Sequence, residues 1–119
     1  MNFETVGENK NITFVRSDGL VISDASSALD LIATVRYETG CDRLIIDKAA
    51  VTEDLFVLSR GVAGEILQKF VNYQIKLAVV GNFSKYTSKP LRDFIYESNK
   101  GRDFFFVGTF DEAVEKLSR

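Results

Sequence analysis

The run Leu44-Ile45-Ile46-Asp47 constrains the fold more than any other stretch of the chain. Three consecutive apolar residues end at a carboxylate, and segments with helical periodicity lie on both sides of them. Such a strand must be covered on both faces, which is typical of an interior strand in a parallel sheet. The arrangement recurs where Ile75 to Val80 ends at Gly81-Asn82, and where Phe104 to Val107 ends at Gly108-Thr109. The three units predict an α/β fold whose parallel core strands lie side by side.

The first third of the chain has the pattern of antiparallel strands instead. Phe3 to Val6 and Ile12 to Val15 are short β-prone runs, and the polar cluster Gly7 to Asn11 between them suits a turn. After a second tight turn, Leu20 to Ile22 resumes the extended pattern. We therefore expect a mixed sheet that begins with an N-terminal antiparallel hairpin or with a three-strand meander.

About four helices are expected. The first runs from about Ala25 to Glu38, and Gly40 ends it as a left-handed cap residue would. The second carries an apolar stripe from Ala63 to Val71, with Gly61 and Gly64 before or inside it. Either the glycines allow the helix to approach the sheet closely, or they mark a break after a short turn. Because glycine inside a helix costs about 1 kcal/mol relative to alanine, we favour the break.

The last two helices have recognisable starts. Pro90, the only proline, suits a first helical turn because its missing amide proton is not needed there, and Asn99 to Gly101 would end this helix. Thr109 with Glu112 three residues later has the spacing of a capping box. The pattern contains no linker or repeat, so residues 1–119 are expected to form a single domain.

Composition limits the classes of partner. The formal net charge of −2 at pH 7 provides no basic field, so we expect neither nucleic acid nor a membrane surface as a partner. The amino terminus lacks the basic and apolar regions of a signal peptide, and no apolar run approaches the length of a membrane span. A cytoplasmic protein of bacterial type is the expectation.

The chain has no histidine, which removes the commonest general base and the commonest zinc ligand. Its one cysteine, Cys41, excludes an internal disulfide, and we expect it to be a small buried hydrophobic residue. Asp47, Glu53 and Asp54 could bind a divalent cation, but acids in this arrangement more often mark the start of a helix. Neither a metal site nor a cofactor is predicted.

Three long segments resemble a known bacterial family. They are Ala63 to Tyr73, Lys76 to Gly81, and Asp93 to Gly101, and they look like the family called domain of unknown function 4180. The resemblance spans essentially the whole chain. It implies kinship and a shared fold, but no activity, because no activity is assigned to that family.

The order of elements is also similar in topology to the anti-sigma-factor antagonists, the STAS or SpoIIAA-like fold. Those proteins carry a Phe-x-Asp-Ser-Ser-Gly-Leu segment in which the Ser before Gly is phosphorylated. The matching piece here is Phe56 to Val62, where Leu58 replaces the Asp and Arg60 replaces the modified Ser. Only Ser59 remains as a hydroxyl, so the resemblance implies a STAS-like module without the phosphorylation switch.

Ligands of open parallel sheets bind outside the carboxyl ends of the strands. The polar residues expected at that edge are the candidate residues for binding a ligand or a partner: Asp47, Thr52, Ser59, Arg60, Ser84, Lys85, Ser88 and Lys89. The last four precede a helix start, where free amide groups favour a small anion such as phosphate or carboxylate. The loop lacks the glycines of a phosphate-binding loop, so a solvated connection with a Ser cap is the competing interpretation.

Three aromatic residues fall in loops or at element ends, namely Phe56, Phe83 and Tyr86. They either cluster on the surface as a contact site or fold back over the core.

The leading hypothesis is a non-enzymatic, STAS-like module that acts through contacts with a protein partner, in regulation. The second is a sensor of a small molecule or anion that uses Lys85, Ser88 and Lys89. The third is an enzyme with Asp47 or Glu53 as general base. A shallow surface at the strand ends would favour a partner, and a deep pocket would favour a ligand.

Overall fold

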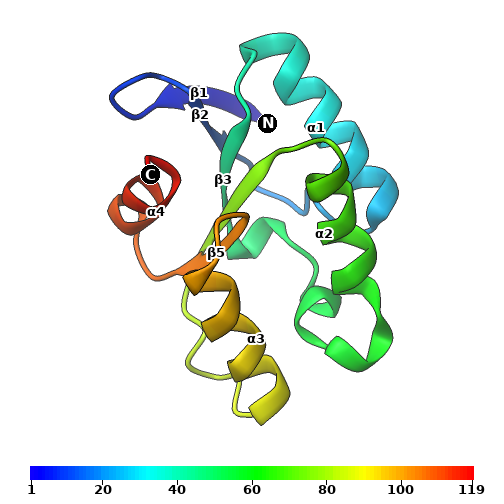
Figure 1. Cartoon of the computed structure of the whole chain (residues 1–119). Helices are drawn as coiled ribbons and strands as arrows, with labels where there is room; N and C mark the ends of the chain where they lie inside the picture. Colours follow the sequence, from blue (N-terminus) through cyan, green and yellow to red (C-terminus); the bar gives the residue numbers. More distant parts are fainter.

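The sheet contains five strands in the spatial order β1-β2-β3-β4-β5, as the computed structural model in Figure 1 shows for all 119 residues. The strands are β1 (Asn2–Val6), β2 (Ile12–Arg16), β3 (Arg43–Asp47), β4 (Lys76–Val80) and β5 (Phe104–Val107). The α-helices are α1 (Ala25–Thr39), α2 (Val62–Asn72), α3 (Lys89–Lys100) and α4 (Phe110–Leu117). Three short 3-10 turns lead from β3 to α2, namely η1 (Lys48–Ala50), η2 (Glu53–Phe56) and η3 (Leu58–Arg60).

The pairing of the strands confirms the predicted fold class. β1 runs antiparallel to β2, and β2, β3, β4 and β5 are parallel to one another. Of the two alternatives for the N-terminal third, the hairpin forms and the meander does not. The segment Leu20 to Ile22 makes only a single bridge, between Ile22 and Val51, because it leads directly to the start of α1.

The helices are divided unequally between the two faces of the sheet. The larger core cluster joins one face to α1, α2 and α3, and the smaller cluster joins the other face to α4 (Figure 1). Crossovers between parallel strands nearly always have one hand, so a sheet that grows in one direction receives all its crossover helices on one face. Within β3, Leu44 and Ile46 therefore pack under the three helices, while Ile45 packs against α4.

The helix boundaries follow the predicted signals closely. α1 is capped by Asp24, whose carboxylate accepts from the Ser27 amide, and Gly40 closes the helix at φ 70°. The predicted break before the main second helix forms at Gly61, which lies at φ 74° between η3 and α2, whereas Gly64 lies inside α2. None of the helices combines the length and the apolar character needed to cross a lipid bilayer.

The later caps also form. The Ser88 side chain accepts from the Leu91 amide, with Pro90 in the first turn of α3. Thr109 accepts from the Glu112 amide, which is one of the two hydrogen bonds of a capping box. Cys41 is a buried free thiol, as expected.

Thr13 is the one buried polar residue of the core, and it ties β2 to the end of α1. Its hydroxyl lies 2.8 Å from that of Thr39. The Thr39 hydroxyl donates to the Val35 carbonyl and also accepts from the Cys41 amide. Thr39 thus serves as acceptor for two donors, while Thr13 depends on Thr39 alone.

This asymmetry predicts unequal costs for two similar substitutions. Thr13→Val should lower the free energy of unfolding by less than about 1 kcal/mol, because Thr39 keeps two partners. Thr39→Val should cost roughly 1–3 kcal/mol, because the buried Thr13 hydroxyl and the Cys41 amide both lose their acceptor. Urea denaturation of the two variants measures the difference, and equal costs would contradict the assignment of Thr39 as the shared acceptor.

Candidate functional site

The carboxyl ends of three parallel strands meet at one open depression. Asp47 from β3, Gly81 after β4 and Gly108 after β5 line it, together with Asn82 and Phe83. The sequence placed the first three of these residues at the same edge, and the structure brings them together. The depression is open to solvent, so it resembles a surface more than an enclosed pocket.

Asp47 and Thr52 serve mainly as caps for the backbone that follows β3. The Asp47 carboxylate accepts from the Ala49 amide at 3.3 Å. The Thr52 hydroxyl accepts from the Asp54 amide at 3.2 Å. Among the candidate residues named from the sequence, Asp47 is the one that lines the depression.

Ser59 and Arg60 are exposed in η3 and do not line the depression. Arg60 is held by an ion pair, since its Nη1 lies 2.8 Å from Asp54 Oδ1. The structure therefore separates the Ser59-Arg60 pair from Asp47, although sequence reasoning grouped them at one edge.

The candidates after β4 each have a partner within the chain. Lys85 lies 3.5 Å from Glu53, and Lys89 lies 2.6 Å from Asp93. Ser88 caps α3, and the Ser84 amide donates to the Asn82 side chain at 2.9 Å. Both lysines of this loop are thus paired with carboxylates, and the loop does not offer two free positive charges to one anion.

A polar cluster lies next to this loop, and we call Lys48, Glu53 and Tyr86 the Lys48 cluster; the sequence pointed to Glu53 and Tyr86 separately but not to their meeting. Lys48 Nζ lies 2.6 Å from Glu53 Oε1, and the Tyr86 hydroxyl donates to Glu53 Oε2 at 2.7 Å. The rings of Phe56 and Tyr86 lie 5.3 and 5.1 Å from Lys48 Nζ, within the range of cation–π contacts. The cluster thus fastens the loop after β4 to η2.

The cluster shifts the protonation equilibria of its members. The hydrogen bond from Lys48, and then that from Tyr86, lowers the pKa of Glu53 below its ordinary value. Burial acts to lower the pKa of Lys48, but hydrogen bonds to Glu53 and Tyr86 outweigh it and raise the pKa. Burial is the largest effect on Tyr86 and raises its pKa. A carboxylate held ionised is a weak proton acceptor near neutral pH, so the site does not favour Glu53 as a general base.

The three neighbouring acids do not converge on a common point. Asp47 caps a turn, Glu53 pairs with Lys48, and Asp54 pairs with Arg60. No group of three metal-ligating side chains is found anywhere in the chain.

Gly81 permits the close approach of β4 to Lys48. A Cβ at this position would lie 2.5 Å from Lys48 Cβ and 3.0 Å from its Cδ. The first of these atoms is next to the main chain and cannot swing away. The sequence signal for this contact is a lysine directly after one buried strand and a glycine directly after the next. Neither residue predicts the contact by itself.

The three loop aromatics fold back over the core instead of forming a separate surface group. Phe56 is buried, and Phe83 and Tyr86 are half-buried. The Phe56 ring lies 5.0 Å from that of Tyr86 and 5.7 Å from that of Phe83, between ring centroids. Phe106 of β5 completes the stack from beneath, at 5.8 Å from Phe83.

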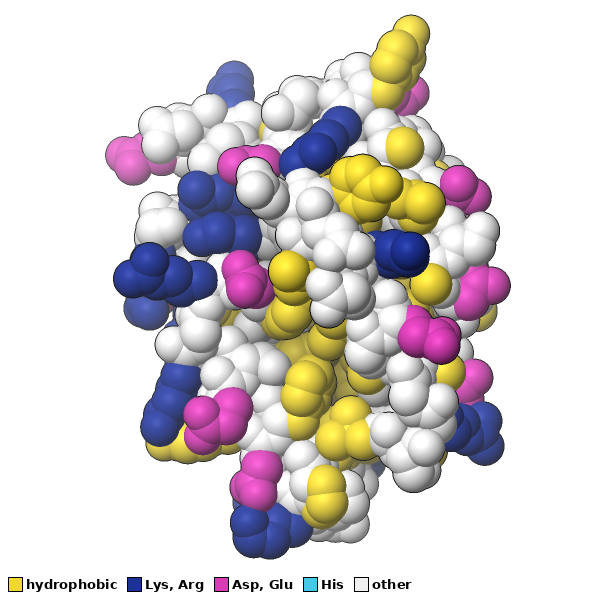
Figure 2. All heavy atoms as spheres, turned by 45° about the vertical axis from the view of Figure 1, so that its right-hand side comes forward, with side chains coloured by type: hydrophobic (Ala, Val, Ile, Leu, Met, Phe, Trp, Pro, Cys, Tyr) yellow, Lys and Arg dark blue, Asp and Glu magenta, His cyan; other side chains and the backbone are white.

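The outer edge of this stack continues into a hollow beside α3. Its apolar lining consists of Phe83, Tyr86, Ile95 and Tyr96, and we call these four residues the aromatic furrow. Tyr96 is 57% exposed. Figure 2 shows hydrophobic side chains in a hollow strip in the lower half of the molecule, the end at which α3 lies in Figure 1.

These features define a small open-sheet α/β domain with three helices on one face, one on the other, and an aromatic furrow near the strand ends. The chain belongs to the family described as domain of unknown function (DUF4180), whose family model matches residues 7–117. Neither the curated proteins nor the solved structures contain a match to the chain. The topological resemblance to the anti-sigma-factor antagonists therefore stays a prediction.

The Gly81 contact predicts a specific sensitivity to a methyl group. Gly81→Ala should lower the free energy of unfolding by about 1–3 kcal/mol, because the new Cβ overlaps the stem of Lys48. Gly64→Ala is the matched control, since it lies inside α2 with no atom near the added Cβ. It should be neutral or stabilise by up to about 1 kcal/mol through helix propensity. Chemical denaturation measures the free energy of unfolding of both variants. A Gly81→Ala variant that is as stable as Gly64→Ala would refute the close approach.

The Lys48 cluster predicts a change in the acid limb of stability. Because folding lowers the pKa of Glu53, its contribution is complete above the ordinary value of 4.5 and is lost as pH falls through the folded pKa. Glu53→Gln should cost up to about 1 kcal/mol at neutral pH, because the Glu53 side chain is 57% exposed and solvent screens its pairing with Lys48. The cost should shrink toward low pH in denaturation curves. Glu97→Gln removes a carboxylate without an ion-pair partner and is the control; a cost of Glu53→Gln that does not vary with pH would contradict the assignment.

Proposed function

We propose that this domain is a non-enzymatic protein-contact module, and that a partner protein docks at the aromatic furrow. The observation that carries the proposal is Tyr96, which is 57% exposed and lines a hollow together with the half-buried rings of Phe83 and Tyr86. Aromatic residues contribute disproportionately to binding energy at protein interfaces. A regulatory role would follow from the identity of the partner.

The surroundings of the furrow support a docking role. Ser84, Thr87 and Arg92 line it beside the four apolar residues, and a second hollow shares Thr87, Arg92 and Tyr96 with it. Protein interfaces commonly combine apolar and polar residues in this way. Arg92 has no carboxylate within 4.0 Å, so it is available to an acidic residue of the partner. A segment with an apolar anchor next to a carboxylate fits this surface.

The shape of the strand-end depression supports the same conclusion. It is open to solvent at Asp47, and such a surface suits a protein partner better than a small molecule that must be enclosed. The small-anion alternative at Lys85, Ser88 and Lys89 has no contact in its favour, because each of these side chains has a partner within the chain.

The test compares two exposed tyrosines on different helices. Tyr96→Ser removes the exposed aromatic residue of the furrow, whereas Tyr37→Ser removes one that is 90% exposed on α1. Affinity capture from the native host with the wild-type protein should retain a partner that Tyr37→Ser also retains and Tyr96→Ser loses. Truncation of a central aromatic contact commonly costs about 2 kcal/mol or more, which is roughly a thirtyfold loss of affinity.

Two further measurements test where the partner docks and whether it is a second copy of the chain. Arg60→Glu reverses a charge at η3 without touching the furrow. If the captured protein depends on Arg60 and not on Tyr96, docking at the furrow is wrong. If sedimentation shows self-association that Tyr96→Ser abolishes, the partner is a second copy of the chain. A capture that yields no protein dependent on Tyr96, with no self-association, rejects the proposal.

A further inference from the structure

The opposite edge of the sheet carries a hollow whose charged lining residues are all basic. It lies at the amino ends of β4 and β5, has a volume of about 530 Å³, and contains no acidic side chain in its lining. The positive residues are Lys76 of β4, Lys100 of α3, Arg102 before β5, Lys116 of α4 and Arg119 after α4. Five of the 15 basic residues thus line one hollow in a chain whose net charge is −2.

Most of these charges have no partner. Arg119 pairs with Glu115, but Lys76, Lys100, Arg102 and Lys116 have no carboxylate within 4.0 Å. Lys100 Nζ lies over the Tyr96 ring, at 4.3 Å from its centroid. The unpaired cluster differs from the carboxyl edge of the sheet, where Lys48, Lys85 and Lys89 each have a carboxylate within 4.0 Å. Like charges held together without partners repel one another, and a bound anion would relieve the repulsion.

Helix ends explain part of the cluster. Lys100 lies in the last turn of α3 and Lys116 in the last turn of α4, where positive charge is stabilised by the free carbonyl groups. Lys76 is instead the first residue of β4, and Arg102 lies in the turn before β5. The charges of Lys76 and Arg102 are therefore not stabilised by the carboxyl end of a helix to which they belong.

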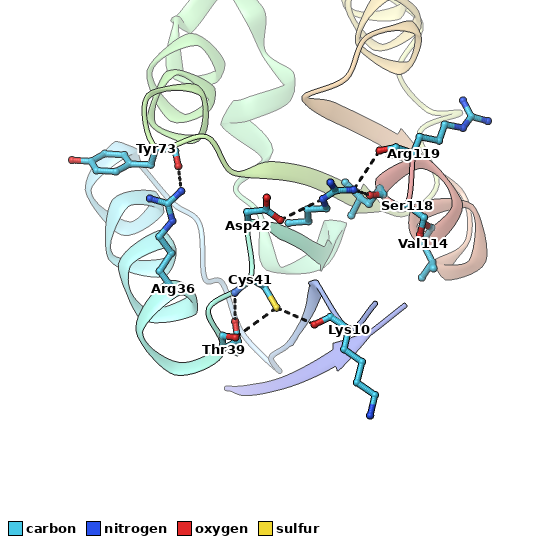
Figure 3. Close-up of polar contacts among 11 residues, drawn as sticks. Lys10, Arg36, Thr39, Cys41, Asp42, Tyr73, Val114, Ser118 and Arg119 are labelled. Atoms are coloured by element: carbon cyan, nitrogen blue, oxygen red, sulfur yellow. Dashed lines mark hydrogen bonds and ion pairs between the residues drawn. The ribbon is translucent and has the colours of Figure 1, made fainter. Parts of the chain in front are cut away.

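A sixth positive residue holds the wall of the hollow in place. Arg43 begins β3 and is the cross-strand neighbour of Lys76. Its guanidinium donates to the Leu117 carbonyl at the end of α4 and lies 3.4 Å from the Arg119 carbonyl. Figure 3 shows this end of α4, with Ser118 and Arg119, beside Asp42 at the approach to β3. The contact fixes α4 against the sheet, so Lys116 is positioned on a rigid element.

We infer that this hollow is a binding site for a small polyanion that carries two or more phosphate groups. Several cations around one cavity match closely spaced negative charges, and charge-assisted hydrogen bonds to phosphate are the stronger kind. The volume is within the usual range for small-molecule sites, about 300–1,000 Å³. Phe105 supplies an apolar surface at the hollow. The negative charge of the rest of the chain disfavours an extended polyanion such as nucleic acid.

The test uses inorganic tripolyphosphate as the probe and isothermal titration calorimetry as the measurement. The wild-type protein should bind it saturably, with an affinity that falls as salt is added. The variant Lys76→Gln with Lys116→Gln should bind at least about tenfold more weakly, since each lost charge-assisted contact commonly contributes this much. The control, Lys85→Gln with Lys89→Gln, removes the same charge at the opposite edge and should bind like the wild type. Amide shifts in NMR spectra should center on Gly101 and Phe105.

A second variant protects the test against a folding defect. Arg102→Gln changes an exposed turn residue with no ion pair, so it should leave the circular dichroism spectrum unchanged while it weakens binding. The inference is overturned if the wild type shows no saturable binding, or if the control pair weakens binding as much as the Lys76 pair. Tighter binding of a DNA duplex than of tripolyphosphate would also overturn it.

Discussion

The structure depends on the two-sided burial of β3. Leu44, Ile45 and Ile46 have no exposed surface, so both faces of the sheet must be covered along this strand. On one face the crossover helices α1 to α3 provide the cover, and on the other the eight residues of α4 must suffice. α4 reaches the hairpin through its first residue, Phe110, whose ring packs on Phe14 of β2, and Arg16 lies over the Phe14 ring. β1 is the edge strand of the sheet, and three of its five residues are exposed.

The two ends of the parallel sheet differ in how their charges are arranged. At the carboxyl ends, Glu53 accepts hydrogen bonds from Lys48 and Tyr86 and also lies near Lys85, so the charged groups there have partners within the chain. At the amino ends, basic residues gather without matching acids. The rule that open sheets bind ligands at the carboxyl ends thus directs attention to the more neutral edge of this domain. What that edge offers instead is an exposed aromatic surface.

Local signals in the sequence predicted most of the fold. Gly40 and Gly61 mark chain reversals at positive φ, and a two-sided apolar run marks each core strand. The extended pattern at Leu20 to Ile22 did not become a full strand, because a strand also needs a neighbour that is free to pair along its length. The candidate site was predicted less well. Asp47 lies where expected. Arg60 instead pairs with Asp54 of the preceding 3-10 turn, and Lys89 pairs with Asp93 of its own helix.

The sequence by itself determined the order of strands and helices, their caps and the family, because these depend on residue types that are close together in the chain. Tertiary structure alone decided which charges meet. Lys48 and Tyr86 are 38 positions apart in the chain and bind the same carboxylate, that of Glu53. The residues that line the basic hollow are spread from Lys76 to Arg119. The packing of helices on a sheet brings such residues together in space. Local sequence patterns do not predict these contacts, because the residues are far apart in the chain.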